Sequence, residues 1–164
     1  MIKTERLFLR RPMAADLAAY TAYCTSKHSS MTGGPFTPVA AFDKLAAMIG
    51  HWTLRGFGRL ILCDAASQRT MGHVGALQLD SAYPAEMSWT LWSPADQGQG
   101  YAYEAARAYL DGAKAAHGFT RLLARIKPSN SRSIALAQRL GGVQTTALPA
   151  PPWFADALSY DFAL

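Results

Sequence analysis

Apolar and polar residues alternate in several short stretches of the chain, and this period of two predicts β-strands. In the first stretch, residues 4–11, Leu7 and Leu9 stand between Arg6 and Arg10, and Pro12 ends the strand. Six further strands are predicted, at residues 59–63, 70–79, 86–92, 119–127, 143–148 and 153–163, of which 86–92 alternates and the others are indicated by apolar stretches between turn residues. Short turns join the first three of these six, so we expect an antiparallel meander.

Four helices are predicted, at residues 16–26, 37–54, 101–116 and 130–140, and in the second of them apolar residues recur at three- and four-residue spacings. The second is marked by Thr37 as N-cap and Pro38 at the first helical position. We expect its buried face to consist of Phe42, Leu45, Ile49 and Trp52. The Gly-Gly-Pro sequence predicts a loop over residues 27–37. The resulting order is β-α-α-β-β-β-α-β-α-β-β, an α/β fold with a mixed sheet.

Length and composition favour one domain spanning residues 1–164, because 164 residues with half of them apolar suffice for one core. No apolar run is long enough to span a membrane, and the charged N-terminus predicts no secretory signal. Cys24 and Cys63 are far apart, which favours buried thiols in a reducing cytoplasm. The net charge of +5 comes from dispersed residues, so we expect no nucleic acid as partner. The four isolated histidines predict no metal site.

A glycine-rich stretch lies between the strand at 86–92 and the helix at 101–116. Gly98 and Gly100 let the backbone approach a ligand, and the free N–H groups of the helix start attract anions. A Walker loop has Lys and Ser/Thr where this chain has Tyr101 and Ala102. A dinucleotide fingerprint has its third Gly, or an Ala, where this chain has Tyr103. Two interpretations remain: a coenzyme A pyrophosphate loop of the form Gln/Arg-x-x-Gly-x-Gly/Ala, or an ordinary turn.

Four stretches together resemble the GNAT N-acetyltransferase superfamily, and within it the ribosomal-protein-alanine (RimJ/RimL-type) branch. They are Thr4 to Arg10 (TERLFLR), Met71 to Gly75 (MGHVG), Gln97 to Ala106 (QGQGYAYEAA), and Asn130 to Ser133 (NSRS) followed by Leu140-Gly141. The predicted element order is also that of the GNAT fold. The resemblance therefore implies a sheet whose central strands splay apart.

The resemblance implies acetyl-CoA as co-substrate and assigns residues to it. Pyrophosphate would bind to the backbone of Gln97, Gly98, Gln99, Gly100, Tyr101, Ala102 and Tyr103. Pantetheine would lie against the backbone near Trp89 and Leu91, in the gap between the strands at 86–92 and 119–127. Asn130 would contact the pantetheine arm or a bound water, and Ser133 would lie near the sulfur. Both residues have a simpler alternative, since Asn130 is a suitable N-cap and a serine is common in a first helical turn.

The family's reaction requires a neutral amine, a proton acceptor and a proton donor for the leaving thiolate. The tyrosine that many members use as the donor is replaced here by Ala137, so Ser133 becomes the candidate. Glu86 is the candidate base, with a solvent-exposed glutamate as the alternative, and His73 lies on the neighbouring strand. We expect Glu104 to complement the helix dipole. Because neither cysteine lies in a motif, we expect direct attack in a ternary complex.

The acceptor is the least defined partner. Met31, Phe36 and Trp52 are candidate acceptor-binding residues, since the two-helix segment walls that site in the GNAT fold, and Trp153 and Phe154 are further candidates. The acceptor would be a primary amine, either a peptide N-terminus or a small molecule. A non-catalytic acyl-CoA-binding module is the alternative function. The oligomeric state stays open, with a homodimer formed through the final strand or the 86–92 region as one option.

Overall fold

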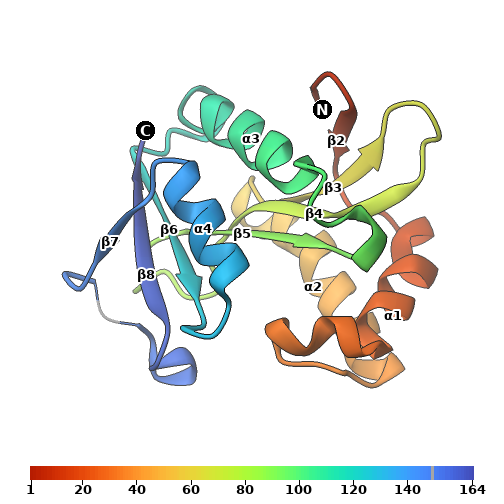
Figure 1. Ribbon diagram of the computed structural model, residues 1–164, viewed down its shortest axis with the longest axis horizontal. Helices are drawn as coiled ribbons and strands as arrows, with labels where there is room; N and C mark the ends of the chain where they lie inside the picture. Colours follow the sequence, from red (N-terminus) through yellow and green to blue (C-terminus); the bar gives the residue numbers. More distant parts are fainter. Residues whose placement is uncertain (149) are drawn as a thin grey trace.

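The computed structural model describes residues 1–148 and 150–164, with the backbone alone at residue 153. Eight strands form one sheet in the order β1-β2-β3-β4-β5-β6-β8-β7 (Figure 1). Their bounds are β1 Ile2–Lys3, β2 Leu7–Arg10, β3 Arg59–Asp64, β4 Thr70–Leu77, β5 Glu86–Leu91, β6 Arg121–Ile126, β7 Val143–Thr145 and β8 Leu158–Ala163. Four α-helices cover the sheet, namely α1 Leu17–Thr25, α2 Pro38–Arg55, α3 Tyr101–His117 and α4 Ser131–Arg139.

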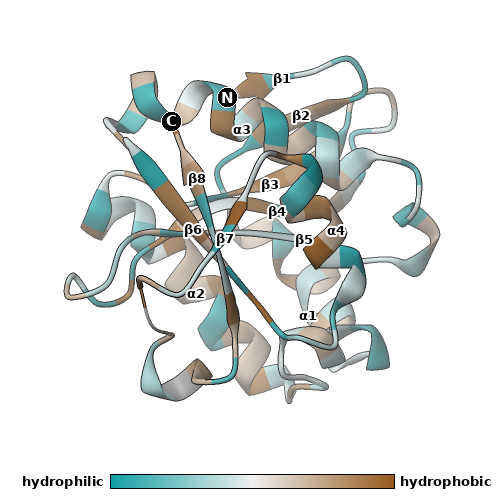
Figure 2. Cartoon of the chain, turned by 60° about the vertical axis from the view of Figure 1, so that its left-hand side comes forward, coloured by the Kyte–Doolittle hydropathy of each residue, from teal (hydrophilic) through white to brown (hydrophobic). Residues whose placement is uncertain are grey.

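The helices divide between the two faces of the sheet, and each face has its own apolar core. Helices α3 and α4 pack on one face, where Tyr109 and Leu110 join Leu60, Leu62 and other strand residues. Helices α1 and α2 cover the other face, where Tyr20, Tyr23 and Leu45 pack against Ile61 and Cys63. Figure 2 shows apolar residues on the strands and more polar residues on much of the helices' surface. The predicted α/β fold with a mixed sheet is confirmed.

Strand pairing creates one discontinuity in the middle of the sheet. Strands β2 to β5 form the predicted antiparallel meander. Strand β5 then pairs with β6 in parallel, through a single register position, Glu86 with Leu123. Beyond that position the two strands diverge, as the splayed arrangement requires. Because β5 and β8 are internal strands, neither region considered for dimerisation is a sheet edge.

Several predicted strand bounds are wrong. The stretch 4–11 contains a turn, since the hydroxyl of Thr4 accepts a hydrogen bond from the backbone of Leu7 and leaves only a short hairpin of β1 and β2. The predicted loop at 27–37 includes a 3₁₀ helix, Lys27–Thr32, which the side chain of Ser26 caps. The last strand starts at Leu158 because Pro152–Phe154 forms a 3₁₀ turn with proline at its start. The strand at 143–148 ends at Thr145.

The predicted face of α2 is confirmed at Leu45 and wrong at Phe42 and Ile49, because the helix is rotated. Its buried residues are Ala41, Leu45, Met48 and His51, whereas Phe42 is 56% exposed. His51 tolerates burial because both ring nitrogens have partners, the carbonyl of Phe57 at 2.7 Å and the N–H of Gln78 at 2.9 Å. Small Ala41 occupies a fully buried position on the same face. A pattern that counts only large apolar residues misses both.

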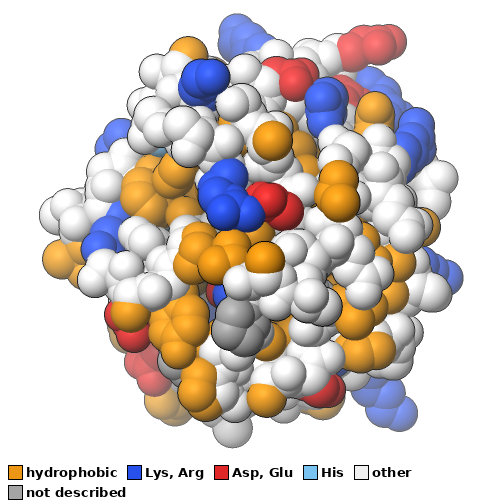
Figure 3. Space-filling view, turned by 90° about the vertical axis from the view of Figure 1, so that its left-hand side faces the viewer, with side chains coloured by type: hydrophobic (Ala, Val, Ile, Leu, Met, Phe, Trp, Pro, Cys, Tyr) orange, Lys and Arg blue, Asp and Glu red, His pale blue; other side chains and the backbone are white. Residues whose placement is uncertain are grey.

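Charge and hydropathy of the described residues add two facts. No helix among them is long and apolar enough to cross a membrane. Figure 3 shows the face on the β7 and β8 side, where basic side chains are scattered and do not form one continuous patch.

Candidate active site

The divergence of β5 and β6 opens a cavity of about 740 Å³. Its walls come from both strands, from the α1–α2 segment and from the start of α4. Trp89 and Met87 belong to the core on the α3/α4 face, whereas Ser88 and Thr90 alternate with them and face the other side. The cavity therefore connects the two faces of the sheet at the place where β5 and β6 cease to pair.

The glycine-rich loop adopts the backbone that an anion site requires. Gly98 has φ 75° and Gly100 has φ 84°, conformations that residues with a side chain rarely adopt. Gly100 is the N-cap of α3, and no side chain caps this helix. The first N–H groups of α3 are therefore available to a ligand, with the positive end of the helix dipole behind them.

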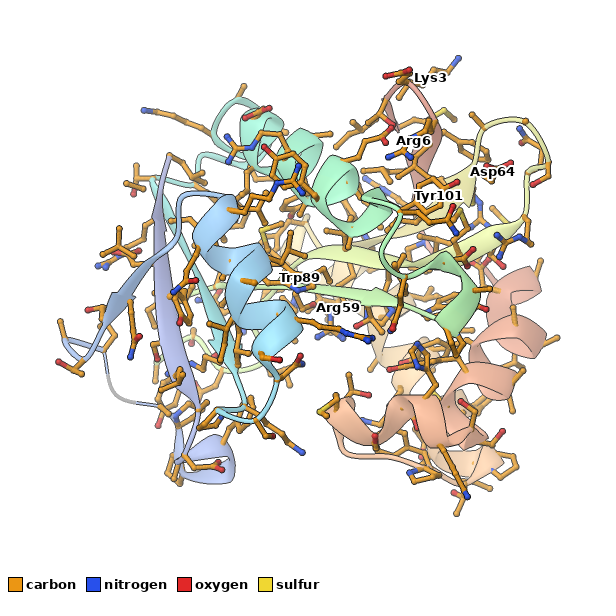
Figure 4. All side chains as sticks on the ribbon, viewed as in Figure 1. Lys3, Arg6, Arg59, Asp64, Trp89 and Tyr101 are labelled. Atoms are coloured by element: carbon orange, nitrogen blue, oxygen red, sulfur yellow. The ribbon has the colours of Figure 1, made fainter. Side chains whose placement is uncertain are left out.

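Arg6 braces this loop from the other end of the chain. Its Nη1 donates to the carbonyl of Gln99 at 3.0 Å, its guanidinium lies 4.5 Å from the centre of the Tyr101 ring, and it forms an ion pair with Glu104 at 2.7 Å (Figure 4). Burial alone would raise the pKa of Glu104, but hydrogen bonds from Thr4 and Arg6 outweigh it and lower the pKa. Glu104 is thus a structural carboxylate that ties the loop helix to the TERL stretch.

A second polar network joins the loop to α4. The Oε1 atom of Gln97 accepts a hydrogen bond from Arg132, and its Nε2 lies 3.2 Å from Nε2 of His28. His28 in turn contacts the carbonyl of Leu91 at 3.0 Å. Gln97 therefore sets the distance between the glycine loop, the end of β5 and the start of α4. Neither Arg132 nor His28 was predicted, because nothing in their local sequence indicates a shared partner.

Trp89, Asn130 and Ser133 meet at one wall of the cavity. The indole N–H of Trp89 donates to Oγ of Ser133 at 3.4 Å, and the backbone N–H of Ser133 donates to Oδ1 of Asn130 at 3.2 Å. Asn130 is the N-cap of α4, so its local alternative role is realised. Since Oγ of Ser133 accepts from Trp89, its own proton is available to the cavity. Leu91 belongs to the same strand but is not part of the cavity wall.

Glu86 sits at the point where β5 and β6 part. Its Oε1 accepts a hydrogen bond from Nε of Arg125 at 2.6 Å, and the Arg125 side chain is 1% exposed. This ion pair fixes the position of the carboxylate at the cavity wall.

His73 lies deeper and is buried. Its Nδ1 accepts a hydrogen bond from the indole of Trp92 at 3.0 Å, so the ring proton is on Nε2. Burial, helped by the charge of Arg59, lowers the pKa of His73 well below its usual range. A ring that resists protonation is a poor proton acceptor.

The candidate acceptor residues separate into two groups. Met31 and Phe36 line the cavity, and so does Phe154. Trp52 does not: its indole N–H donates to the carbonyl of Arg59 at 2.9 Å, and its ring packs against Arg11 and His117. Trp52 is therefore a packing residue between α2 and the sheet. The side chain of Trp153 lies outside the described residues.

Arg59 lines the cavity and was not predicted from the sequence. Arg59 begins β3 on the face of Ile61 and Cys63, and its Nε donates to Oγ of Ser88 at 2.7 Å. Tyr20 and Tyr23 of α1 line the same region. The sequence did contain one signal for this residue, because Arg59 is a charged residue at the start of an otherwise apolar strand. Within the described part of the chain, no group of three residues suited to hold a metal ion occurs.

Comparison with known proteins gives a consistent result. Residues 6–143 match the family model of the acetyltransferase (GNAT) domain. An acetyltransferase structure from Agrobacterium tumefaciens is 29% identical, with 99% of this chain and 94% of that chain covered and a TM-score of 0.90. No curated protein sequence matches the chain.

Two further structures are similar in fold. A spermidine N-acetyltransferase from Vibrio cholerae, solved with CoA and spermine, is 17% identical, with 98% and 96% covered and a TM-score of 0.75. A ribosomal-protein-S5-alanine acetyltransferase from Vibrio fischeri is also 17% identical, with 98% and 94% covered and a TM-score of 0.73.

Proposed function

The chain belongs to the GNAT acetyltransferase family, and from that membership we propose that it transfers the acetyl group of acetyl-CoA to a primary amine by direct attack in a ternary complex. The observation that carries the proposal is the cavity between β5 and β6, which runs from Ser133 on one face of the sheet to Met31 and Phe36 on the other. An amine entering from the α1–α2 side can reach a thioester placed in the gap.

The co-substrate would bind along a path that the chain's polar groups define. The backbone from Gln97 to Tyr103 would hold the pyrophosphate, and the uncapped start of α3 suits this anion. Trp89, Leu91 and Asn130 would contact the pantetheine arm. The exposed guanidinium of Arg132, held near the loop by Gln97, adds positive charge there.

Two residues would handle the protons. Ser133 would donate to the departing sulfur, since its hydroxyl faces the cavity and its oxygen is already held by Trp89. Glu86 would accept a proton from the attacking amine, directly or through water, because its carboxylate is held at the cavity wall by Arg125. A covalent acetyl-cysteine is disfavoured, since Cys24 and Cys63 are buried outside the cavity and burial raises the pKa of both thiols.

Titration calorimetry with acetyl-CoA, followed by thiol release with a panel of amines, tests the proposal. The panel needs peptides beginning in Ala or Ser beside small amines, because the RimJ/RimL-type resemblance favours a peptide N-terminus while the similar folds include a polyamine enzyme. Absence of binding near millimolar acetyl-CoA would end the proposal. Binding without thiol release would favour the alternative, an acyl-CoA-binding module, for which Ala137 at the usual tyrosine position is the supporting feature.

A further inference from the structure

The guanidinium of Arg59 lies inside the cavity and has no anionic partner among the described residues. Its Nε bonds to Ser88, but no described residue accepts a hydrogen bond from Nη1 or Nη2. The ion pairs of the described residues do not include Arg59, and the carboxylate at the cavity wall beside it, Glu86, is already paired with Arg125. Figure 4 shows Arg59 extending into the centre of the molecule.

The sheet register explains how the side chain arrives there. Arg59 on β3 lies opposite Gly75 on β4, and Gly75 lies opposite Ser88 on β5. The guanidinium crosses β4 at its glycine and reaches Ser88, two residues from the point where β5 leaves β6. The positive charge of Arg59 therefore lies on the α1–α2 side of the gap, the side proposed for the acceptor.

Keeping an unpaired guanidinium here costs stability. Burial lowers the pKa of Arg59, and attraction to Tyr20 and Glu86 offsets only part of that effect. Arg59 is half-buried at the cavity wall, and a partly desolvated charge without an ion-pair partner there indicates that a ligand brings the partner. Burial raises the pKa of Tyr20, so its hydroxyl remains a neutral hydrogen-bond donor in the same wall.

We propose that the acceptor amine carries a carboxylate, which Arg59 binds through Nη1 and Nη2 while the amine faces the gap. This inference rests on the proposed acetyl transfer and specifies its substrate class. The planar fork of arginine matches a carboxylate in two parallel hydrogen bonds. The described lining residues include four cationic side chains, Lys44, Arg59, Arg125 and Lys127, against two anionic ones, Asp80 and Glu86. A polyamine would add positive charge to this excess and is disfavoured.

Binding of acetylated products tests the proposal without requiring turnover. The probes are N-acetyl-L-alanine and N-acetyl-L-glutamate for free amino acids, and N-acetyl-L-alanyl-L-aspartate for an acidic peptide, each beside its amide-blocked form. Titration calorimetry should show that the parent protein prefers the carboxylate form of at least one pair by about tenfold or more, the strength of a charge-assisted pair. The pair that shows the preference identifies the source, free amino acid or peptide.

Variants then assign the preference to Arg59. Arg59→Gln should abolish it, Arg59→Lys should keep part of it, and the matched control Arg121→Gln, an exposed ion-paired arginine on β6, should keep all of it. Equal binding of carboxylate and amide probes to the parent, or an undiminished preference in Arg59→Gln, would overturn the proposal. If carboxylate binding follows Arg59 but no amine is acetylated, the binding site stands and the proposed transfer fails. Arg59→Gln should also unfold at the same temperature as the parent or higher, which shows that lost binding is not lost folding.

Discussion

The two halves of the site differ in how the chain builds them. The glycine loop is one continuous segment, residues 97–103. Its two glycines with positive φ and the start of helix α3 lie within a few residues of one another in the sequence. The cavity draws on α1, α2, β3, β4, β5, β6 and α4, and its lining residues are spread from Tyr20 to Phe154. The loop is also held by exposed polar contacts, whereas the cavity wall holds the guanidinium of Arg59, which forms no ion pair with another described residue.

This difference separates co-substrate binding, which a whole family shares, from acceptor recognition, which differs between its members. A co-substrate shared by a whole family can be bound by backbone groups, which any sequence supplies if its glycines are in place. An acceptor is recognised by side chains, so each chain can change it by single substitutions on a fixed sheet. We therefore expect mutations in the loop to alter co-substrate affinity alone, and mutations in the cavity to alter chemistry or acceptor choice.

Ser133→Ala should have the largest effect, on turnover. If Ser133 protonates the departing sulfur, its loss should lower kcat about 100-fold while changing acetyl-CoA affinity by less than about twofold. Steady-state kinetics and calorimetry together measure both quantities. Ser131→Ala, an exposed position one residue into the same helix, is the control and should match the parent. A kcat within threefold of the parent would assign proton donation to water instead.

Gly100→Val should weaken acetyl-CoA binding about tenfold or more, equivalent to about 1.4 kcal/mol. A valine at φ 84° forces the loop to change its backbone, and its Cβ would also meet Nη2 of Arg6 at 3.4 Å. Calorimetry measures the affinity, and circular dichroism checks that α3 remains. Gly112→Ala in the middle of α3, where a Cβ meets nothing within 4 Å, should leave affinity unchanged. A folded Gly100→Val protein with parental affinity would contradict the loop assignment.

Acid should destabilise the protein through His73. Its pKa is depressed in the folded state, so below the unfolded value of about 6.5 the unfolded chain binds a proton that the native protein refuses. The free energy of unfolding should therefore fall by about 1 kcal/mol between pH 7.5 and pH 5.5, and this loss should grow at lower pH. Urea unfolding at the two pH values measures the difference.

His73→Asn is the matched variant, because its side-chain oxygen can still accept from Trp92. It should show about 1 kcal/mol less loss than the parent over the same range. The pKa of His117 is also lowered, chiefly by burial, so some loss in the same direction should remain. An acid response identical to that of the parent would mean that His73 does not control it.

Arg6→Gln should have the smallest effect, about a threefold loss of acetyl-CoA affinity, because the brace is solvent-exposed and such ion pairs contribute little each. Calorimetry at low and physiological salt measures it, and added salt should reduce the difference between variant and parent. The control is Arg121→Gln, whose ion pair with Asp161 lies on β6 and β8. A loss as large as that of Gly100→Val would show that Arg6 touches the co-substrate itself.

The sequence was informative wherever one element carries its own pattern. The order of strands and helices, the meander and the glycine turn all follow from local periodicity and turn residues. It failed for α2, where Ala41 and a doubly hydrogen-bonded His51 are buried in place of Phe42 and Ile49. A helix face is chosen by what it packs against, and that information is not local.

The site shows the same limit. Gly98, Gly100 and Asn130 could be selected from spacing alone, and Met31 and Phe36 from their place in the family fold. Arg59 could not, because its role depends on the glycine opposite it on β4 and the serine beyond that on β5. Trp52 was chosen as an aromatic in the right segment, but its side chain points to the sheet. Cross-strand register decides the case of Arg59, and the packing of α2 on the sheet decides that of Trp52.

Because a single register pair joins β5 to β6, much of the border between them lacks backbone pairing, and we expect the sheet to open there first. Hydrogen exchange should resolve β1 to β5 as one block and β6 to β8 as another, with fast-exchanging amides along their shared border. A bound molecule whose amides pair with that border would link the blocks and slow exchange in both. The thermal stability of this protein should then rise with co-substrate concentration, so that a depleted pool leaves it easier to unfold and degrade.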